Sequence, residues 1–416
     1  MSPRSPLRAQ LVVAAFALAG ALFLSSSASA TRAAVILKAF SPASLAAALD
    51  KAKPGDSIAL ADGTYPKLSV SGRRYTGWVT IYGTRNARIG GIVFGNSTNI
   101  VLRGVTITPT DGTPAVVGIL KGSNSITLDR LLVDGKSESL GARINTDRSS
   151  SNVTIENSEI TNCGRGSRCV GPAANVLTVL GNKFHDCFDC DFIRGGGSNI
   201  TIRGNTFDRA VRGTCQGGAE HCPHNDHIQI MGGGPWSIIA NRFGDRNGGA
   251  ASIFVSTGLH NTDNEIHDVL IASNLFKGTN TGAYGVEIAA GDPDSAPERV
   301  KVTNNTILSG SLTAVRLGSG WDVIPRIDQP LVTDNILRVA GQVQCGRARH
   351  IANLVESGST CKDNAFGSAK LDNAGAPTGQ STLVINKADP KYQYPTDYYA
   401  FPRGMTPDRG AIEYRG

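Results

Sequence analysis

The chain has 416 residues, of which 49 are glycine and only 6% are aromatic, and its formal net charge is +7. This composition argues against a mainly helical protein and favours many short strands joined by tight turns. The modest positive charge suits an anionic glycan or serves solubility alone. Because no basic run is interleaved with aromatic residues, nucleic acid is not expected as a partner.

The first thirty residues have the features of a cleavable signal peptide. Arg4 and Arg8 precede an apolar run from Leu11 to Leu24. Small residues for cleavage follow at Ala28-Ser29-Ala30. The apolar run is shorter than a bilayer requires, and no later stretch is apolar enough to span one. We therefore expect a secreted or extracytoplasmic protein with cleavage near Ala30.

A short amphipathic helix is predicted at the start of the mature chain. Ser41-Pro42 has the pattern of an N-cap and first helical residue, and Lys53-Pro54-Gly55 ends the segment. Four apolar residues between them share one face: Leu45, Ala48, Leu49 and Ala52. Since a stack of repeats needs a cover at each open end, we expect this helix to close the first repeat.

A β unit recurs along most of the chain: a short strand, then an Asn, then a bulky apolar residue one or two places later. Less regular units lie between Trp78 and Leu128. The repeated Asn residues are Asn157, Asn182, Asn205, Asn241, Asn274, Asn305, Asn335 and Asn364. Successive positions differ by 23 to 36 residues, which is typical of stacked supersecondary units. Asn tolerates a left-handed backbone, and its amide can bond to the Asn of the next unit.

Two segments resemble a known family. The stretch from Ser44 to Tyr65, SLAAALDKAKPGDSIALADGTY, is similar to the opening of pectate-lyase-like right-handed parallel β-helix proteins, notably the chondroitinase and alginate lyase group. The stretch from Pro407 to Tyr414, PDRGAIEY, looks like the end of many bacterial β-helix proteins. The resemblance covers nearly the whole mature chain. The catalytic Lys-and-Arg motifs of that group have no match here, nor do the Gly-His-Gly and Arg-Ile-Lys signatures of polygalacturonase-type hydrolases.

The repeat and the resemblance together predict an all-β fold, a single-stranded right-handed parallel β-helix with a short N-terminal capping helix. We expect one domain over residues 31–416. Its parts are an N-terminal cap at about 31–65, coils at about 66–379, and a C-terminal cap or tail at about 380–416 that is rich in Pro and Tyr. We expect a monomer.

Two consecutive coils carry the sharpest candidate chemistry. Aligned on Asp191 and Asp226, they place two pairs in register: Phe192 with His227, and Arg194 with Gln229. If the isoleucines that flank Gln229 point inward, alternation along the strand makes His227 and Gln229 point outward. The same rule predicts an outward column of side chains on one strand face: Arg143, Phe192, Arg194, His227, Gln229, Phe254, Glu287 and Arg316. The alternative is an ordinary solvated face.

These residues suggest chemistry on a uronic acid polymer. His227 or His224 could accept a proton near neutral pH, with Asp226 orienting the imidazole. Arg194 and Gln229 could hold a carboxylate, which acidifies the adjacent C–H. The remaining column residues would bind substrate: Arg143, Phe254, Glu287 and Arg316. We therefore predict a polysaccharide lyase, or a related enzyme such as an epimerase, that acts on an acidic polysaccharide. A glycoside hydrolase and a non-catalytic carbohydrate-binding β-helix are the alternatives.

Four carboxylates crowd the same two coils: Asp186, Asp189, Asp191 and Asp226. Hard oxygen ligands at this density suggest Ca²⁺. They could also share the acid and base roles of a glycosidase, or simply cap turns. Transition-metal binding by His224, His227 and Asp226 is the weaker alternative.

Eight cysteines in an exported chain predict disulfides. Equivalent positions in adjacent coils lie about as far apart as the Cα atoms of a disulfide. The predicted bridges are Cys163–Cys187, Cys169–Cys190, Cys215–Cys222 and Cys345–Cys361. Local pairing of Cys163 with Cys169 and of Cys187 with Cys190 is the alternative.

Overall fold

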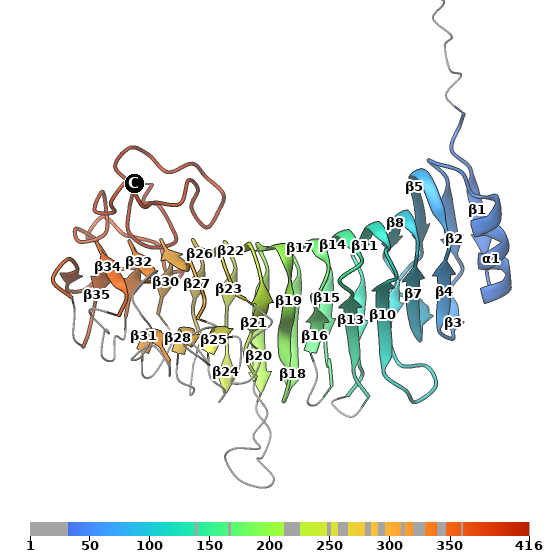
Figure 1. Cartoon of the computed structure of the whole chain (residues 1–416), viewed down its shortest axis with the longest axis horizontal. Helices are drawn as coiled ribbons and strands as arrows, with labels where there is room; N and C mark the ends of the chain where they lie inside the picture. The colour runs from blue at the N-terminus through green and yellow to red at the C-terminus, as the bar shows by residue number, and fades with distance from the viewer. Residues whose placement is uncertain are drawn as a thin grey trace, which may run out of the picture. The chain divides into compact units, whose positions relative to one another are not determined.

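In the computed structural model, short strands stack into coils, and successive coils add strands to three parallel sheets (Figure 1). The structure describes residues 32–137, 140–164, 168–211, 225–247, 251–256, 265–278, 284–289, 296–308, 313–318, 329–338, 347–358 and 361–415. Residues Val35–Gly416 form one compact unit. Within a coil the chain runs through sheet C, then sheet A, then sheet B.

Sheet C consists of β4 (Leu68–Ser71), β7 (Gly91–Gly95), β10 (Ala115–Leu120), β13 (Ala142–Thr146), β16 (Arg168–Gly171), the first part of β19 (Asp191–Arg203), β21 (Ile228–Gly233), β25 (Ala251–Ser256), β28 (Tyr284–Ala289) and β31 (Thr313–Leu317).

Sheet A consists of β1 (Ile36–Ala39), β2 (Ser57–Leu60), β5 (Arg74–Tyr82), β8 (Thr98–Arg103), β11 (Asn124–Asp129), β14 (Ser151–Glu156), β17 (Asn175–Leu180), the second part of β19, β22 (Trp236–Ile239), β26 (Val269–Ala272), β29 (Lys301–Thr303), β32 (Leu331–Thr333) and β34 (Arg349–Ile351).

Sheet B consists of β3 (Gly63–Tyr65), β6 (Ala87–Ile89), β9 (Thr106–Ile107), β12 (Leu132–Asp134), β15 (Glu159–Thr161), β18 (Lys183–Phe188), β20 (Thr206–Val211), β23 (Arg242–Phe243), β24 (Arg246–Asn247), β27 (Leu275–Phe276), β30 (Thr306–Ile307), β33 (Ile336–Leu337), β35 (Leu354–Val355) and β36 (Ala365–Phe366).

The predicted capping helix is present as α1 (Pro42–Lys51). Ser41 is its N-cap and forms a reciprocal capping box with Ser44, which satisfies backbone donors at the first turn. The helix packs its buried residues against β1 and β2 at the start of the stack (Figure 1). Strands β2 and β3, which lie in the segment predicted as the cap, already pair with the following coil.

The interior is a continuous core of aliphatic side chains with one row of aromatic rings. Phe184, Phe207, Phe243 and Phe276 occupy equivalent positions in sheet B, and neighbouring rings stack with centroids 4.6–5.2 Å apart. These are the bulky residues that follow the repeated Asn in the sequence, so the repeat predicts their shared row.

The repeated Asn side chains form a buried hydrogen-bonded ladder at the turn from sheet A to sheet B. The Oδ1 atom of Asn241 accepts from the backbone N (2.9 Å) and from Nδ2 (3.0 Å) of Asn205 in the preceding coil. Nδ2 of Asn241 donates to Oδ1 of Asn274 in the next coil (3.1 Å). The pattern runs from Asn182 to Asn364, and it confirms the amide ladder predicted from the repeat.

Three details of that prediction are wrong. Asn157 is not a ladder member, because Ser158 takes the equivalent position and donates its backbone N–H to Asn182 Oδ1. Asn353 is a ladder member that was missed. It divides the interval between Asn335 and Asn364 into two coils. The left-handed residue is the one before the ladder Asn, as at Ala240, where φ is 54°.

The C-terminal segment packs along the side of the late coils (Figure 1). The side-chain hydroxyl of Ser273 donates to Thr396 O (2.8 Å), and Asp334 Oδ1 accepts from the Asp389 backbone N (2.7 Å). Gly410 N donates to Asp334 O (2.7 Å). The segment therefore holds several coils together from outside the stack.

Candidate functional site

His227 and Phe192 are both buried in the core, so the outward orientation predicted for these two side chains is wrong. The predicted register is correct, because Ile193 pairs with Ile228 and Arg194 with Gln229. However, β21 begins at Ile228, and the alternation of a strand does not extend across the corner before it. The imidazole is 0% exposed and stacks on the rings of Phe192 (5.8 Å) and Phe243 (5.6 Å).

Burial, and then the nearby Arg246 charge, lower the pKa of His227 to about 3. The ring is therefore neutral in the ordinary pH range, and with no exposed surface it cannot reach a polysaccharide. This position does not suit a catalytic base. The other candidate base, His224, lies outside the described residues.

The two aspartates used for the alignment cap the corner of sheet C. Asp191 Oδ1 accepts from the Asp226 backbone N (2.8 Å), and Asp226 Oδ1 accepts from the Ala251 backbone N (2.8 Å). Both side chains are fully buried. They act like the Asn ladder, each satisfying the backbone of the next coil.

The four predicted calcium ligands do not converge. Asp186 is paired with His185 (2.6 Å) and Arg209 (2.5 Å), away from the buried caps at Asp191 and Asp226. Asp189 is a buried residue with a left-handed backbone. Within the described residues, the one close group of three potential metal ligands is Cys169, Cys187 and Cys190. The carboxylates therefore do not fit a Ca²⁺ site.

The disulfides are local. Cys163 pairs with Cys169, and Cys187 pairs with Cys190. The predicted cross-coil bridges Cys163–Cys187 and Cys169–Cys190 are therefore wrong, although Cys163 follows β15 and Cys187 lies in β18, the strand that pairs with β15. Cys361 is disulfide-bonded, while three predicted partners lie outside the described ranges: Cys215, Cys222 and Cys345.

The rest of the predicted column, apart from Arg143, lies on the outer face of sheet C, where Gln229 and Glu287 are buried. Arg194, Gln229, Phe254, Glu287 and Arg316 are in register across five successive strands. Glu287 forms an ion pair with Arg316 (3.5 Å). In β13 the position in register with this column is Asn145. Arg143 therefore lies two residues away from the column.

Three arginines lie close together at the N-terminal end of this column. Partial burial lowers the pKa of Arg168, and the positive charges of Arg194 and Arg143 lower it further. Asp191 opposes this effect, and its Oδ2 lies 3.4 Å from Arg194 Nη1. Arg168 was not among the predicted residues. The sequence signal for Arg168 was its place at the start of β16, in register with Asp191.

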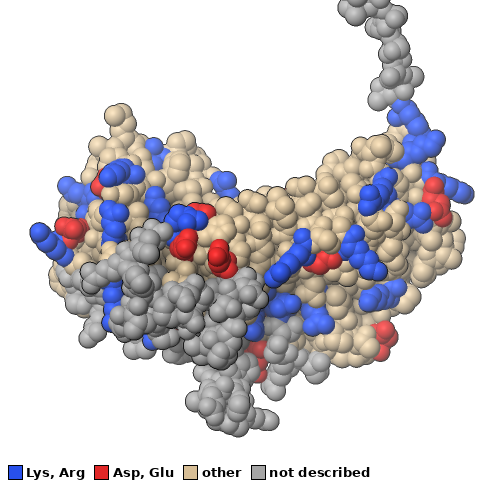
Figure 2. Space-filling view, viewed as in Figure 1, with Lys and Arg blue, Asp and Glu red and all other residues tan. Residues whose placement is uncertain are grey.

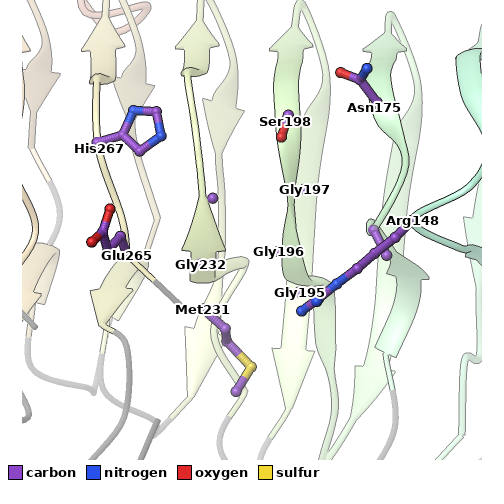
Figure 3. A pocket seen from close by; sticks show the side chains of 12 residues that line it. Arg148, Asn175, Gly195, Gly196, Gly197, Ser198, Met231, Gly232, Glu265 and His267 are labelled. Carbon is purple, nitrogen blue, oxygen red and sulfur yellow. The ribbon is translucent and has the colours of Figure 1, made fainter. Parts of the chain in front are cut away.

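A groove of about 640 Å³ lies beside this cluster, at the turn from sheet C to sheet A (Figure 3). Its floor is glycine backbone: Gly195, Gly196, Gly197, Gly232 and Gly233. A Cβ on Gly195 would lie 2.4 Å from Pro172 O, and one on Gly197 would lie 2.9 Å from Ala174 O. Only glycine therefore allows these coils to stack so closely while leaving the floor flat.

Side chains rise at both ends of the groove (Figure 3). Arg148 points in from one end, and Glu265 and His267 stand at the other. Met231 lines the groove and its sulfur lies 3.4 Å from Arg194 Nε, which connects the groove to the arginine cluster. In Figure 2, basic side chains are spread over the visible face, and acidic ones are fewer.

The comparisons with known proteins concern the fold. The sequence matches the family profile described as "Right handed beta helix region" at residues 79–207 and 144–324. The adhesin PfbA of Streptococcus pneumoniae is 13% identical, with a TM-score of 0.50 over 79% of this chain and 92% of that chain. The pectate lyase Pel9A is 14% identical, with a TM-score of 0.42 over 92% of this chain and 97% of that chain.

A mutant of the PL6-family alginate lyase AlyGC is 14% identical, with a TM-score of 0.46 over 92% of this chain. The chain spans only 59% of the AlyGC length. Curated protein sequences gave no match. In the part of the chain that the structure describes, every helix is too short or too polar to cross a membrane. Since the two profile matches together run from residue 79 to residue 324, the chain belongs to the right-handed β-helix family.

Proposed function

We propose that this protein is exported, binds an acidic polysaccharide along sheet C and the adjoining groove, and cleaves it by β-elimination. The observation that carries the proposal is the cluster of Arg143, Arg168 and Arg194. Three guanidinium groups within electrostatic range of one another favour a bound anion, because an anion relieves their mutual repulsion.

The shape of the surface supports a polymer as the ligand. The arginine cluster, Met231 and the groove are continuous, and the groove is lined by residues of five successive coils. At a coil spacing of roughly 4.8 Å, it offers room for several sugar units in a row. A guanidinium also matches a uronate carboxylate in planar, bidentate geometry.

Elimination requires that the uronate carboxylate be neutralised, so that the C–H beside it becomes acidic. Arginines can supply that positive charge, and the four aspartates predicted to bind Ca²⁺ do not form a site that would. We therefore expect turnover to persist in the presence of a calcium chelator.

The test is a panel of uronic acid polysaccharides, assayed for binding and for ultraviolet absorbance from unsaturated products. Arg168→Gln should weaken binding roughly 10-fold or more, since a charge-assisted hydrogen bond is worth about 1.5–3 kcal/mol. Arg88→Gln on sheet B is the matched control, because it makes the same change in net charge on another face. Wild-type binding should weaken as salt is added.

Failure of every acidic polysaccharide to bind would contradict the proposal, as would equal weakening by the two substitutions. Binding without unsaturated products would reduce the protein to a carbohydrate-binding β-helix. New reducing ends without ultraviolet absorbance would instead indicate a glycoside hydrolase.

A further inference from the structure

His267 is held by a chain of charged partners that leaves one ring nitrogen facing the groove. Its Nδ1 lies 2.9 Å from Asp268 Oδ2. Arg299 in turn binds both oxygens of that carboxylate, with Nε–Oδ1 at 2.6 Å and Nη2–Oδ2 at 3.0 Å. These hydrogen bonds keep the pKa of Asp268 well below its usual range, so the carboxylate is an anion. An anion beside Nδ1 favours the tautomer with hydrogen on Nδ1 and a lone pair on Nε2.

The backbone of His267 is fixed as firmly as its ring. Its N–H donates to Gly233 O (3.1 Å), and Asp268 N–H donates to Glu298 O (3.1 Å). Gly234 packs so closely that a Cβ there would lie 2.0 Å from His267 O. Among the described residues, none bonds to Nε2 of His267, and the side chain is 35% exposed.

The other end of the groove supplies the opposite charge. Arg148 and His267 come from coils four steps apart, roughly 19 Å at the usual spacing. Both side chains point inward over the glycine floor (Figure 3), so their end groups are closer than their backbones. A uronate on this floor could present its carboxylate to Arg148 and its C–H side to His267.

From this arrangement we infer that His267 is the general base of the groove, with Asp268 and Arg299 as its positioning residues. The inference rests on the proposed function and adds the place and the agent of proton transfer. Nε2 takes the proton from C5 of the uronate, and the C–H electrons form the C4=C5 double bond. The C4–O glycosidic bond breaks with its electrons on oxygen, the leaving oxygen takes a proton from water, and the imidazolium returns its proton to solvent.

His185 resembles His267 in one feature and lacks the others that a general base of the groove requires. His185 also lies beside an aspartate, with Nδ1 2.6 Å from Asp186 Oδ2. However, its Nε2 is 2.9 Å from Glu159 Oε1, and it belongs to sheet B instead of the groove. Both of its nitrogens are occupied, so His185 serves as the matched control.

The experiment compares steady-state cleavage by wild type, His267→Gln and His185→Gln on the polysaccharide that wild type cleaves best. His267→Gln should lower kcat by roughly 100-fold or more and leave KM within about twofold, whereas His185→Gln should stay near wild type. Asp268→Asn, which keeps the imidazole, should lower kcat by roughly 10-fold or more at unchanged KM. Added imidazole should restore part of the activity of His267→Ala.

Wild-type rates in His267→Gln would overturn the assignment of His267 and leave the proposed function intact. So would a folded His267→Ala that imidazole does not rescue, or a full rate in Asp268→Asn. If wild type binds acidic polysaccharides and releases no unsaturated product, the general base is overturned and only the binding half of the proposed function survives.

Discussion

His227 and His267 each have an aspartate as sequence neighbour, but they lie in opposite surroundings. His227 is a neutral ring inside the aromatic row, and His267 is a partly exposed ring above a glycine floor. Asp226 is bonded to the backbone of the next coil, and Asp268 is bonded to the imidazole itself. A local Asp-His pair therefore does not identify an active site in a β-helix. The position of the pair within the coil determines whether the imidazole is buried or faces the groove.

The largest effect on stability should come from the interior ladder. Asn241→Ala removes the acceptor for Asn205 and leaves buried backbone groups unsatisfied, including the carbonyl of Ile202. We expect a loss of about 3–5 kcal/mol in the free energy of unfolding, measured by denaturant titration.

Asn157→Gly is the matched control for that measurement. Asn157 lies outside the ladder and has a φ of 52°, so glycine removes its side chain without straining the backbone. Its effect should stay below about 1 kcal/mol. Equal losses in the two variants would contradict the ladder as the special support of the interior.

The next largest effect is the pH dependence of stability that arises from the buried His227 ring. The pKa of His227 is about 3 in the folded protein and near 6.5 when the ring is exposed, so the unfolded chain binds a proton first. Its contribution to stability is therefore lost as pH falls from 6.5 towards 3. At about 1.4 kcal/mol per pKa unit, the loss should approach 3 kcal/mol near pH 4.

His227→Phe, which extends the aromatic row, should flatten this acid limb in unfolding experiments run from pH 7 to pH 4. His350, whose pKa burial lowers to about 4, leaves a residual slope in this variant. A wild-type slope in His227→Phe would place His227 outside the core.

The smallest effect depends on pH in the opposite direction, because here stability falls as pH rises. Burial raises the pKa of Asp334, which contacts the C-terminal segment, to about 6. The stability that its protonated form contributes is full below about pH 4 and is lost as pH rises through about 6. Asp334→Asn keeps an acceptor for Asp389 N and should raise stability at pH 7 by roughly 2 kcal/mol, with little change at pH 4. Thermal unfolding at both pH values would measure the difference.

Much of the fold could be predicted, because a repeated residue in a stacked coil has a repeated physical task. The Asn positions predicted the ladder, and the alignment of Asp191 with Asp226 predicted the register of sheet C correctly. The orientation of His227 failed because the period of two belongs to strands and ends at a corner. The disulfides failed because several pairings satisfy the same spacing.

The groove was harder to predict. Its floor is made of glycines, which in sequence resemble ordinary turn residues, and its polar groups come from separate coils. One signal was available for His267. Asp268 and Arg299 are 31 residues apart, the same separation as the ladder residues Asn274 and Asn305. Charges of opposite sign at the repeat interval indicate neighbours on adjacent coils.

The Asn ladder also has a consequence for how such a protein can change in evolution. Each ladder Asn from Asn182 to Asn353 accepts from the coil before it and donates to the coil after it, so a duplicated or deleted coil joins its neighbours by the same bonds. A gene could thus gain or lose one whole repeat without a new core, whereas an insertion of part of a repeat inside a strand would misalign every later contact. Each added coil would lengthen the outer surface by about 4.8 Å, so polymer-binding surfaces of this kind can grow in steps comparable to one sugar ring.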